Sequence, residues 1–358
     1  MEEHRILAIN PGSTSTKIAV FQGNKSIFLK NIKHSAEEIN KFEKIVDQFE
    51  FRKEIILKEL KEAEINVQEL SAIVGRGGLV KPIPSGVYEV NQAMIDDLIA
   101  SKLGEHASNL GGLIANDIAK SLPSARAFIA DPVVVDELDD VARYTGNPKF
   151  VRHSIFHALN QKAVARKYAK ANDKKYEDLN LIVAHLGGGV SVGAHKGGNV
   201  IDVNNALDGD GPFSPERTGT LPAGQMAKLC FSGEYTLDDV KKMIKGEGGL
   251  VSYLGTNDAY EVEMRVKDGD KEAKNVQDAM SYQIAKEIGS LSAVLKGKVD
   301  AIILTGGMAY NPFLVEYVKD LVSFLAPVVV YPGEDEMEAL ASNGYMVLKG
   351  EIEPKEYK

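Results

Sequence analysis

The feature that most constrains the fold of this sequence is a strand, a turn of small residues and a second strand, a unit that occurs twice. The first turn comprises residues 11–16, and the second is Gly187-Gly188-Gly189. A further strand follows each copy. The predicted strands are 5–10, 17–22 and 26–32 in the first copy, and 181–186, 190–195 and 199–203 in the second. Two such units about half a chain apart, each followed by helices, predict a duplicated α/β architecture with a ligand cleft between its halves.

The length of 358 residues favours two domains over one. The turn-forming residues Thr145 to Pro148 predict a boundary near residue 150. We therefore expect an N-terminal domain at 1–150 and a C-terminal domain at 151–334, with a C-terminal helical segment at 335–358 that returns to the first domain. The other predicted elements are helices at 36–63 and 155–171, a strand at 70–75, a strand at 126–130 and a buried strand at 300–304.

Charge and composition exclude several classes of protein. A formal charge of −9 and a pI near 5.4 argue against a nucleic-acid surface, which needs clustered Lys and Arg. No apolar run approaches the roughly 20 residues that span a bilayer. The single cysteine, Cys230, allows no internal disulfide, and no secretory apolar region follows the polar start. We expect a cytoplasmic enzyme without nucleic-acid or membrane partners.

The two turns are candidate phosphate sites, because backbone amides of Gly, Ser and Thr turns can approach phosphate oxygens closely. The first turn adds the hydroxyls of Ser13 and Ser15 and is bracketed by Asn10 and Lys17. Neither turn matches the Walker or dinucleotide pattern, and each alone is equally typical of an ordinary hairpin. A third glycine pair, Gly306-Gly307 after a buried strand, suits either the face of a nucleoside or close packing of the backbone.

Two histidine segments are candidates for chemistry. His153 and His157 are four residues apart at the start of the predicted helix, so that both side chains would share a face. A third ligand is not evident, which favours a hydrogen-bonded role over a metal site. His185 lies at the end of an apolar strand, directly before the glycine turn, where it could donate to a transferring phosphoryl group or be a satisfied core histidine.

Arg76, Arg217 and Asp131 occupy strand ends and loops, where active sites are commonly built. The planar guanidinium groups match carboxylate and phosphate oxygens. Asp131 precedes Pro132, and its alternative role is that of a turn aspartate.

Several segments together resemble the acetokinase family of acetate and butyrate kinases, and the sequence is most similar to its butyrate kinase branch. The matching segments, in chain order, are 6–18, 75–78, 152–158, 184–189, 217–219 and 304–307. The resemblance implies the actin-like ATPase fold in two duplicated domains of the ribonuclease H-like type, with ATP mainly on the second, and a homo-oligomer built from dimers. It implies transfer of a phosphoryl group between ATP and a short-chain carboxylate.

The resemblance also implies roles for individual residues. Asn10 and Lys17, with Ser13 and Ser15, match the first phosphate segment. Arg76 and Arg217 match the arginines at the acyl carboxylate and the transferring phosphoryl group, and His185 matches the histidine that stabilises that group. His157 becomes the second active-site histidine. The residues implied at the nucleotide are Gly187, Gly188, Gly189, Gly306 and Gly307.

Magnesium is the implied metal cofactor, and Asp131 and Asn10 are its candidate ligands. Acetate kinases carry a glutamate three residues beyond the second glycine of the nucleotide turn, whereas this sequence has Tyr310. Glu334, Asp335, Glu336 and Glu338 are the acids that offer a substitute.

A carboxylate has a pKa of about 4 to 5 and is already a nucleophile at neutral pH, so direct in-line transfer needs no general base. We expect butyrate or a branched short acid such as isobutyrate, because Gly77 and Gly78 after Arg76 would leave room for a longer acyl chain. Alternatively, these glycines only permit a tight turn. The competing functions are an acetate or propionate kinase, a kinase of alcohols, and an actin-like ATPase without acyl substrate.

Overall fold

The computed structural model describes residues 4–358, which form two compact units. Unit 1 contains the chain up to Val135 together with Asp335–Lys358, and unit 2 is Asp136–Glu334. The division falls between Val135 and Asp136, whereas the sequence placed it near residue 150, so the segment 136–150 packs with the second half of the chain. That the two units are domains with a ligand cleft between them stays a prediction.

Unit 1 is built on a six-stranded sheet. In spatial order its strands are β3 (Lys25–Lys33), β2 (Ser15–Gln22), β1 (Arg5–Pro11), β4 (Leu70–Arg76), β6 (Arg126–Ala130) and β5 (Val87–Glu89). β1 is antiparallel to β2 but parallel to β4, and β4 is parallel to β6. The carboxyl ends of β1, β4 and β6 therefore meet at one edge of the sheet, the edge where ligands commonly bind in open α/β sheets. Asn10, Arg76 and Asp131 lie at these three ends.

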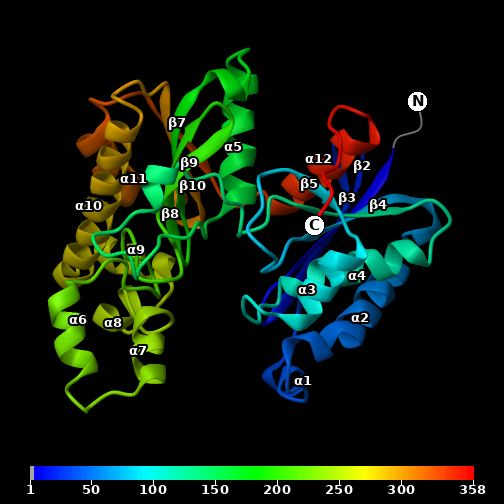
Figure 1. Cartoon of the computed structure of the whole chain (residues 1–358), viewed down its shortest axis with the longest axis horizontal. Helices are drawn as coiled ribbons and strands as arrows, with labels where there is room; N and C mark the ends of the chain where they lie inside the picture. The colour runs from blue at the N-terminus through cyan, green and yellow to red at the C-terminus, as the bar shows by residue number, and fades with distance from the viewer. Residues whose placement is uncertain (1–3) are drawn as a thin grey trace. The chain divides into compact units, whose positions relative to one another are not determined.

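Helices cover both faces of this sheet (Figure 1). The helices of unit 1 are α1 (Ala36–Ile39), α2 (Phe49–Glu62), α3 (Gln92–Ala100), α4 (Asn109–Lys120) and α12 (Glu336–Leu348), with 3-10 turns at Ile45–Gln48 and Val67–Glu69. The predicted helical region 36–63 is thus interrupted between Ile39 and Ile45. Successive strand residues face opposite sides: a Cβ at Gly75 would lie 2.2 Å from the carbonyl oxygen of Gly111 in α4, whereas Val74 packs against Gly344 of α12.

The C-terminal tail after α12 is anchored to unit 1. Tyr357 is buried, and its hydroxyl donates to Asp97 Oδ2 at 2.7 Å and accepts from the amide of Lys81 at 3.0 Å. Burial and the hydrogen bond to Asp97 raise the pKa of Tyr357 to about 12. β1 and the C-terminal tail therefore both contribute to the core of unit 1.

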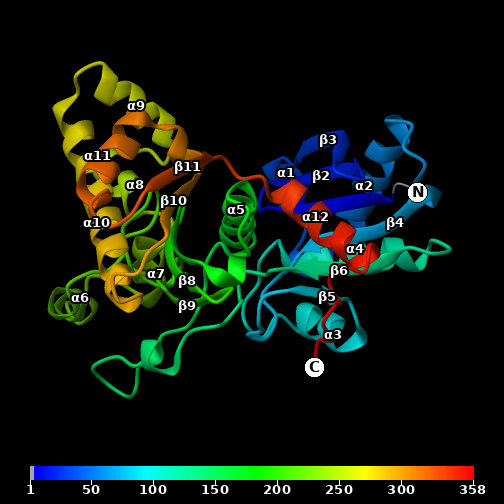
Figure 2. The same ribbon diagram turned by 90° about the horizontal axis from the view of Figure 1, so that it is seen from above.

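Unit 2 contains a five-stranded sheet in the order β11 (Val328–Pro332), β10 (Ala301–Gly306), β7 (Asn180–Leu186), β8 (Val190–Lys196) and β9 (Asn199–Val203). Its helices are α5 (Ala158–Ala171), α6 (Ala223–Cys230), α7 (Leu237–Ile244), α8 (Leu250–Leu254), α9 (Ala259–Lys267), α10 (Lys271–Val294) and α11 (Pro312–Val322), with 3-10 turns at Asp140–Arg143, Tyr176–Asp178 and Gly307–Tyr310. The sheet lies between α5 on one face and α10 with α11 on the other (Figure 2). Along β7, Leu181 and Val183 pack with α5, whereas Ile182 and Ala184 pack with α10.

The two sheets repeat one another. In unit 1, β3, β2 and β1 form an antiparallel meander, and β4 and β6 extend it as parallel strands. In unit 2, β9, β8 and β7 form the same meander, and β10 and β11 extend it as parallel strands. β5 is an addition at the edge of the first sheet. The predicted duplicated α/β architecture is confirmed.

None of the helices in residues 4–358 has both the length and the apolar character needed to cross a bilayer.

Candidate active site

The turn between β1 and β2 is closed by a hydrogen bond from the amide of Gly12 to the carbonyl oxygen of Ser15 at 2.7 Å. Ser13 is exposed at its tip, and Ser15 begins β2. Asn10 and Lys17 are directly opposite each other in the β1–β2 ladder, a position that places side chains on the same face of the sheet. The structure therefore brings the four predicted residues of the first phosphate segment to one strand–turn–strand unit.

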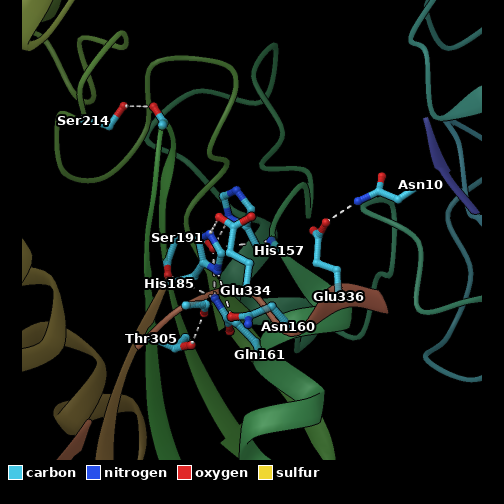
Figure 3. Close-up of polar contacts among 12 residues, drawn as sticks. Asn10, His157, Asn160, Gln161, His185, Ser191, Ser214, Thr305, Glu334 and Glu336 are labelled. Carbon is cyan, nitrogen blue, oxygen red and sulfur yellow. Dashed lines mark hydrogen bonds and ion pairs between the residues drawn. The ribbon is translucent and has the colours of Figure 1, made fainter. Parts of the chain in front are cut away.

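Arg76 meets Asn10 at the carboxyl ends of β4 and β1. Its Nη1 donates to Asn10 Oδ1 at 3.3 Å and lies 3.2 Å from Oε1 of Glu336, the first residue of α12. Asn10 Nδ2 donates to the same carboxylate (Figure 3). Glu336 is one of the four acids that the sequence offered as substitutes for the family glutamate, and it contacts both Asn10 and Arg76.

Asp131 directly follows β6 and is 2% exposed. Its Oδ1 accepts hydrogen bonds from Ser85 Oγ at 2.6 Å and from the amide of Gly86 at 2.8 Å. The backbone of Asp131 has a φ of 37°, a region that residues with a Cβ seldom adopt. Strained conformations of this kind are concentrated at functional sites, which supports the choice of Asp131 from the sequence.

The expectation that Gly77 and Gly78 leave room for an acyl chain is wrong. A Cβ at Gly77 would lie 2.5 Å from Cβ of Pro132, and a Cβ at Gly78 would lie 2.5 Å from Cα of Asn109. The volume that the missing side chains vacate is filled by the protein itself. The glycines allow a tight backbone turn against the start of α4, and they provide no pocket.

In unit 2, His185 and His157 stack on one another with ring centroids 3.8 Å apart and planes inclined by 10° (Figure 3). His185 is fully buried at the end of β7, and its Nδ1 donates to Asn160 Oδ1 at 2.8 Å. Its Nε2 lies 3.1 Å from Glu334 Oε1, an ion-pair distance, without the alignment of a hydrogen bond. The structure thus pairs the two predicted histidines and adds Glu334 as an acid beside them.

His157 is oriented by a chain of buried hydrogen bonds that sequence reasoning missed. Gln161 Nε2 donates to Ser191 Oγ at 2.9 Å and to the Ser191 carbonyl oxygen at 3.0 Å. Ser191 Oγ accepts from Gln161 and also from the backbone amide of His157 at 3.4 Å, which uses both of its lone pairs, so its own proton is directed to His157 Nδ1, 2.8 Å away. The oxygen of the same side-chain amide, Gln161 Oε1, accepts from Nε2 of His195 at 3.0 Å. The proton of neutral His157 therefore resides on Nε2, which makes Nε2 the donor.

Arg217 lies against the second glycine turn. Its Nη1 donates to the Ala206 carbonyl oxygen at 2.8 Å, while its buried Nε has no hydrogen-bond acceptor within residues 4–358. A Cβ at Gly189 would lie 1.7 Å from Nη1, so only glycine at 189 leaves space for this guanidinium. Burial lowers the pKa of Arg217 from its usual value, and Glu216 opposes this shift. The arrangement leaves donors of Arg217 for an anion.

A cavity of about 530 Å³ opens beside this turn in unit 2. Its lining includes Gly187, Gly188, Gly307, Tyr310 and Glu334. A Cβ at Gly307 would meet nothing within 4 Å, whereas one at Gly306 would lie 2.4 Å from the Leu186 carbonyl oxygen. Gly306 therefore serves backbone packing, whereas Gly307 faces the cavity, and its contact with a nucleoside stays a prediction. The volume is typical of small-molecule sites.

One further expectation, that His153 and His157 share a helix face, is wrong. α5 begins at Ala158 and His157 is its N-cap, so His153 and His157 do not share a helix face. His153 is exposed in the preceding loop.

Tyr310, at the position of the family glutamate, is 68% exposed at the cavity. Within residues 4–358, no three His, Cys, Asp or Glu side chains converge to hold a metal ion.

An acidic cluster supports the loop that carries Ala206. Arg152 forms ion pairs with Asp202 at 2.9 Å and with Asp210 at 3.6 Å. Burial, followed by the charge of Asp210, raises the pKa of Glu287 on α10 to about 7. Glu287 therefore binds its proton more tightly in the folded than in the unfolded chain between pH 4.5 and 7.

We expect Glu287→Gln to stabilise the protein in a pH-dependent manner. In the wild type the free energy of unfolding falls as the pH rises from about 4.5 to 7, because the native state holds the extra proton. The variant should gain about 1 to 2 kcal/mol on the wild type between pH 5 and pH 8. Urea unfolding at several pH values measures this gain. Glu272→Gln, at an exposed site on the same helix, is the control, and an equal pH dependence in wild type and Glu287→Gln would contradict the prediction.

Comparison with known proteins agrees with this geometry. The profile of the acetokinase family matches residues 140–329. Butyrate kinase 2 and butyrate kinase 1 of Clostridium acetobutylicum are 58% and 59% identical to the chain over 354 and 355 residues, which is 99% of this chain in both cases and 99% and 100% of the respective relatives. The crystal structure of Porphyromonas gingivalis acetate kinase superposes with a TM-score of 0.78 at 19% identity, covering 96% of this chain and 100% of the other.

A duplicated sheet of this order, superposing on an acetate kinase over nearly the whole chain, defines a protein of the actin-like ATPase fold. The chain belongs to the acetokinase family.

Proposed function

We propose that this protein is a short-chain acyl kinase that transfers the γ-phosphoryl group of ATP reversibly to butyrate or a branched acid of similar size. The observation that carries the proposal is the identity of 58% with a butyrate kinase over 99% of both chains. The products would be ADP and an acyl phosphate.

The chemistry fits the side chains at the two sites. A carboxylate substrate needs no general base, and it does need cations that hold two anions in line. Arg76 would position the acyl carboxylate, and Arg217 with His185 would stabilise the transferring phosphoryl group. His157, with its proton directed to Nε2 by Ser191, would act as a second donor. Asp131, Asn10 and Lys17 would complete the site at the edge of the first sheet. In this mechanism the phosphoryl group passes directly to the acid without a phosphoenzyme.

ATP would occupy the cavity of unit 2. Gly187, Gly188 and Gly189 offer backbone amides to its phosphates, and Gly307 leaves the open face against which a nucleoside fits. Tyr260 and Tyr310, both largely exposed at the rim, offer flat rings for stacking on a base.

Magnesium would be held by few protein ligands. Asn10 Oδ1 and the carboxylates of Glu336 and Asp131 are hard oxygen donors of the kind that magnesium prefers. Magnesium in phosphoryl-transfer sites commonly takes one or two carboxylates together with phosphate oxygens and water, so the small donor set fits the ion. Bound there, it would neutralise charge on the phosphate oxygens.

Two alternatives remain to be separated by experiment: an acetate or propionate kinase, and an actin-like ATPase without an acyl substrate. The second leaves Arg76 and the partly unsatisfied Arg217 without a purpose. We further propose a cytoplasmic location and a homo-oligomer built from dimers, as the family resemblance implies.

We expect butyrate or isobutyrate to give the highest kcat/KM in a series of acetate, propionate, butyrate, isobutyrate and valerate. Each buried methylene contributes about 0.8 kcal/mol, so two of them favour butyrate over acetate by about tenfold. Acyl hydroxamate formation from each acid and ATP provides the measurement. A maximum at acetate or propionate would support the first alternative, and ATP hydrolysis independent of every acid would support the second.

A further inference from the structure

A buried arginine lies behind the turn between β1 and β2. Arg52 is in the first turn of α2 and is 1% exposed. Its Nη1 donates to the carbonyl oxygens of Gly12 at 2.8 Å and Ser15 at 3.1 Å, and its Nη2 donates to the carbonyl oxygen of Ser13 at 3.1 Å. The guanidinium therefore donates hydrogen bonds to three backbone carbonyl groups of a single turn.

The partners of this guanidinium are all uncharged. The remaining hydrogen bonds reach Thr16 Oγ1 at 3.0 Å and Gln48 Oε1 at 2.8 and 3.0 Å. Within residues 4–358, no carboxylate pairs with Arg52. Burial lowers its pKa to about 10, so it stays charged at neutral pH. A buried charge without a counter-ion is costly, and its field extends through the turn instead of being neutralised locally.

The orientation of the carbonyl groups determines the orientation of the amides. In a planar trans peptide, the C=O of one residue and the N–H of the next point in opposite directions. Because the carbonyl groups of Gly12 and Ser13 point to Arg52, the N–H groups of Ser13 and Thr14 point away from it. Both residues are exposed, and neither amide has a hydrogen-bond acceptor within the described chain. Successive outward amides form an anion-binding concavity.

From this geometry we infer that Arg52 is a positioning residue that makes the turn an anion site. It holds the carbonyl groups inward so that the amides of Ser13 and Thr14 face a phosphate group, and it supplies from behind the positive charge that the anion neutralises. The inference rests on the proposed function only in identifying the anion as a phosphoryl group of ATP or of the acyl phosphate.

The direct test observes the turn in the full-length protein. In protein labelled with ¹⁵N-threonine, the amide resonance of Thr14, identified by its loss in Thr14→Ser, is followed during titration with inorganic phosphate. We expect a saturable shift in the wild type, and a phosphate Kd raised about tenfold or more in Arg52→Met. Arg52→Lys retains the charge but loses the planar guanidinium that binds several carbonyl groups at once, and it should raise the phosphate Kd several-fold. Lys58→Met removes an exposed cation from the same helix and should leave the Kd unchanged.

Kinetics add a measurement that a purely structural role would not reproduce. In folded Arg52→Lys, the KM for butyryl phosphate should rise several-fold while kcat changes much less. An unmoved Thr14 resonance in the wild type, or a phosphate Kd in Arg52→Lys equal to that of the wild type, overturns the inference. If the wild type phosphorylates no acid but the Arg52 variants still bind phosphate more weakly than the wild type, the proposed function is rejected and the role of Arg52 is supported.

Discussion

Replacing Arg217 by alanine is expected to lower kcat for acyl phosphate formation by about 10² to 10³, with a much smaller change in the KM for ATP. The guanidinium is mostly buried, is held by one carbonyl group and retains donors for an anion. A preorganised cation in such a site stabilises charge that develops in the transition state, and it contributes less to binding of the nucleotide. His185→Ala should lower kcat by about 10² for the same reason. Steady-state kinetics with ATP and butyrate test both values.

The control for these variants is Arg126→Ala. Arg126 forms a bidentate ion pair with Glu89 on the partly exposed edge of unit 1. This ion pair includes none of the residues proposed to bind a ligand. Its removal should leave kcat within about twofold of the wild type, because exposed ion pairs contribute little. Turnover close to the wild type in Arg217→Ala and in His185→Ala would refute the assignment of both residues.

Gly189→Ala is expected to abolish most activity while the fold is retained. The new methyl group would lie 1.7 Å from Arg217 Nη1, which is the end of a flexible side chain and not backbone. The guanidinium must therefore move, and the strands of the sheet need not. We expect kcat to fall by about 10² or more, as in Arg217→Ala, since a misplaced cation loses its electrostatic effect. The melting temperature should change by only a few degrees.

Two other glycine-to-alanine variants serve as controls for this prediction. Gly146→Ala adds a methyl group that meets nothing within 4 Å, so it should leave both activity and stability unchanged. Gly75→Ala would force a methyl group into the backbone of α4 and should destabilise unit 1. If Gly189→Ala retains full turnover, Arg217 does not act from the position observed. In the double variant Gly189→Ala/Arg217→Ala, the losses should not add, because both changes remove the same interaction.

Much of the architecture was predictable because local patterns specify it. Apolar runs such as Ile6 to Ile9, bounded by small-residue turns, predicted the central strands, and their repetition in the second half predicted the duplication. His185 and the two arginines were placed correctly at strand ends and in loops, whereas His157 was expected within the helix and is its N-cap. Boundaries were less predictable: the helix after His157 starts later than its periodicity indicated, since the amide and the imidazole of His157 are both hydrogen-bonded to Ser191 on β8.

What the sequence did not reveal depends on distant contacts. Arg52 is one of 42 basic residues and looks like a surface charge on a periodic helix, and only the packing of α2 against a turn 40 residues earlier shows that it is buried. Glu336 meets Arg76 across 260 residues. The role of Gly78 was inferred wrongly because a missing side chain signals either an open pocket or a close neighbour. The position of Asn109 decides between these alternatives, and no local pattern encodes it.

The anchoring of α12 and Tyr357 to unit 1 has a consequence for the order of events during synthesis. Unit 2 is a continuous segment, Asp136–Glu334, and can form its complete sheet as soon as that segment has left the ribosome. Unit 1 emerges first, yet the helix that covers one face of its sheet is translated last. One apolar face of the unit 1 sheet therefore stays uncovered until α12 has been synthesised. Nascent chains with exposed apolar surface of this kind rely on chaperones.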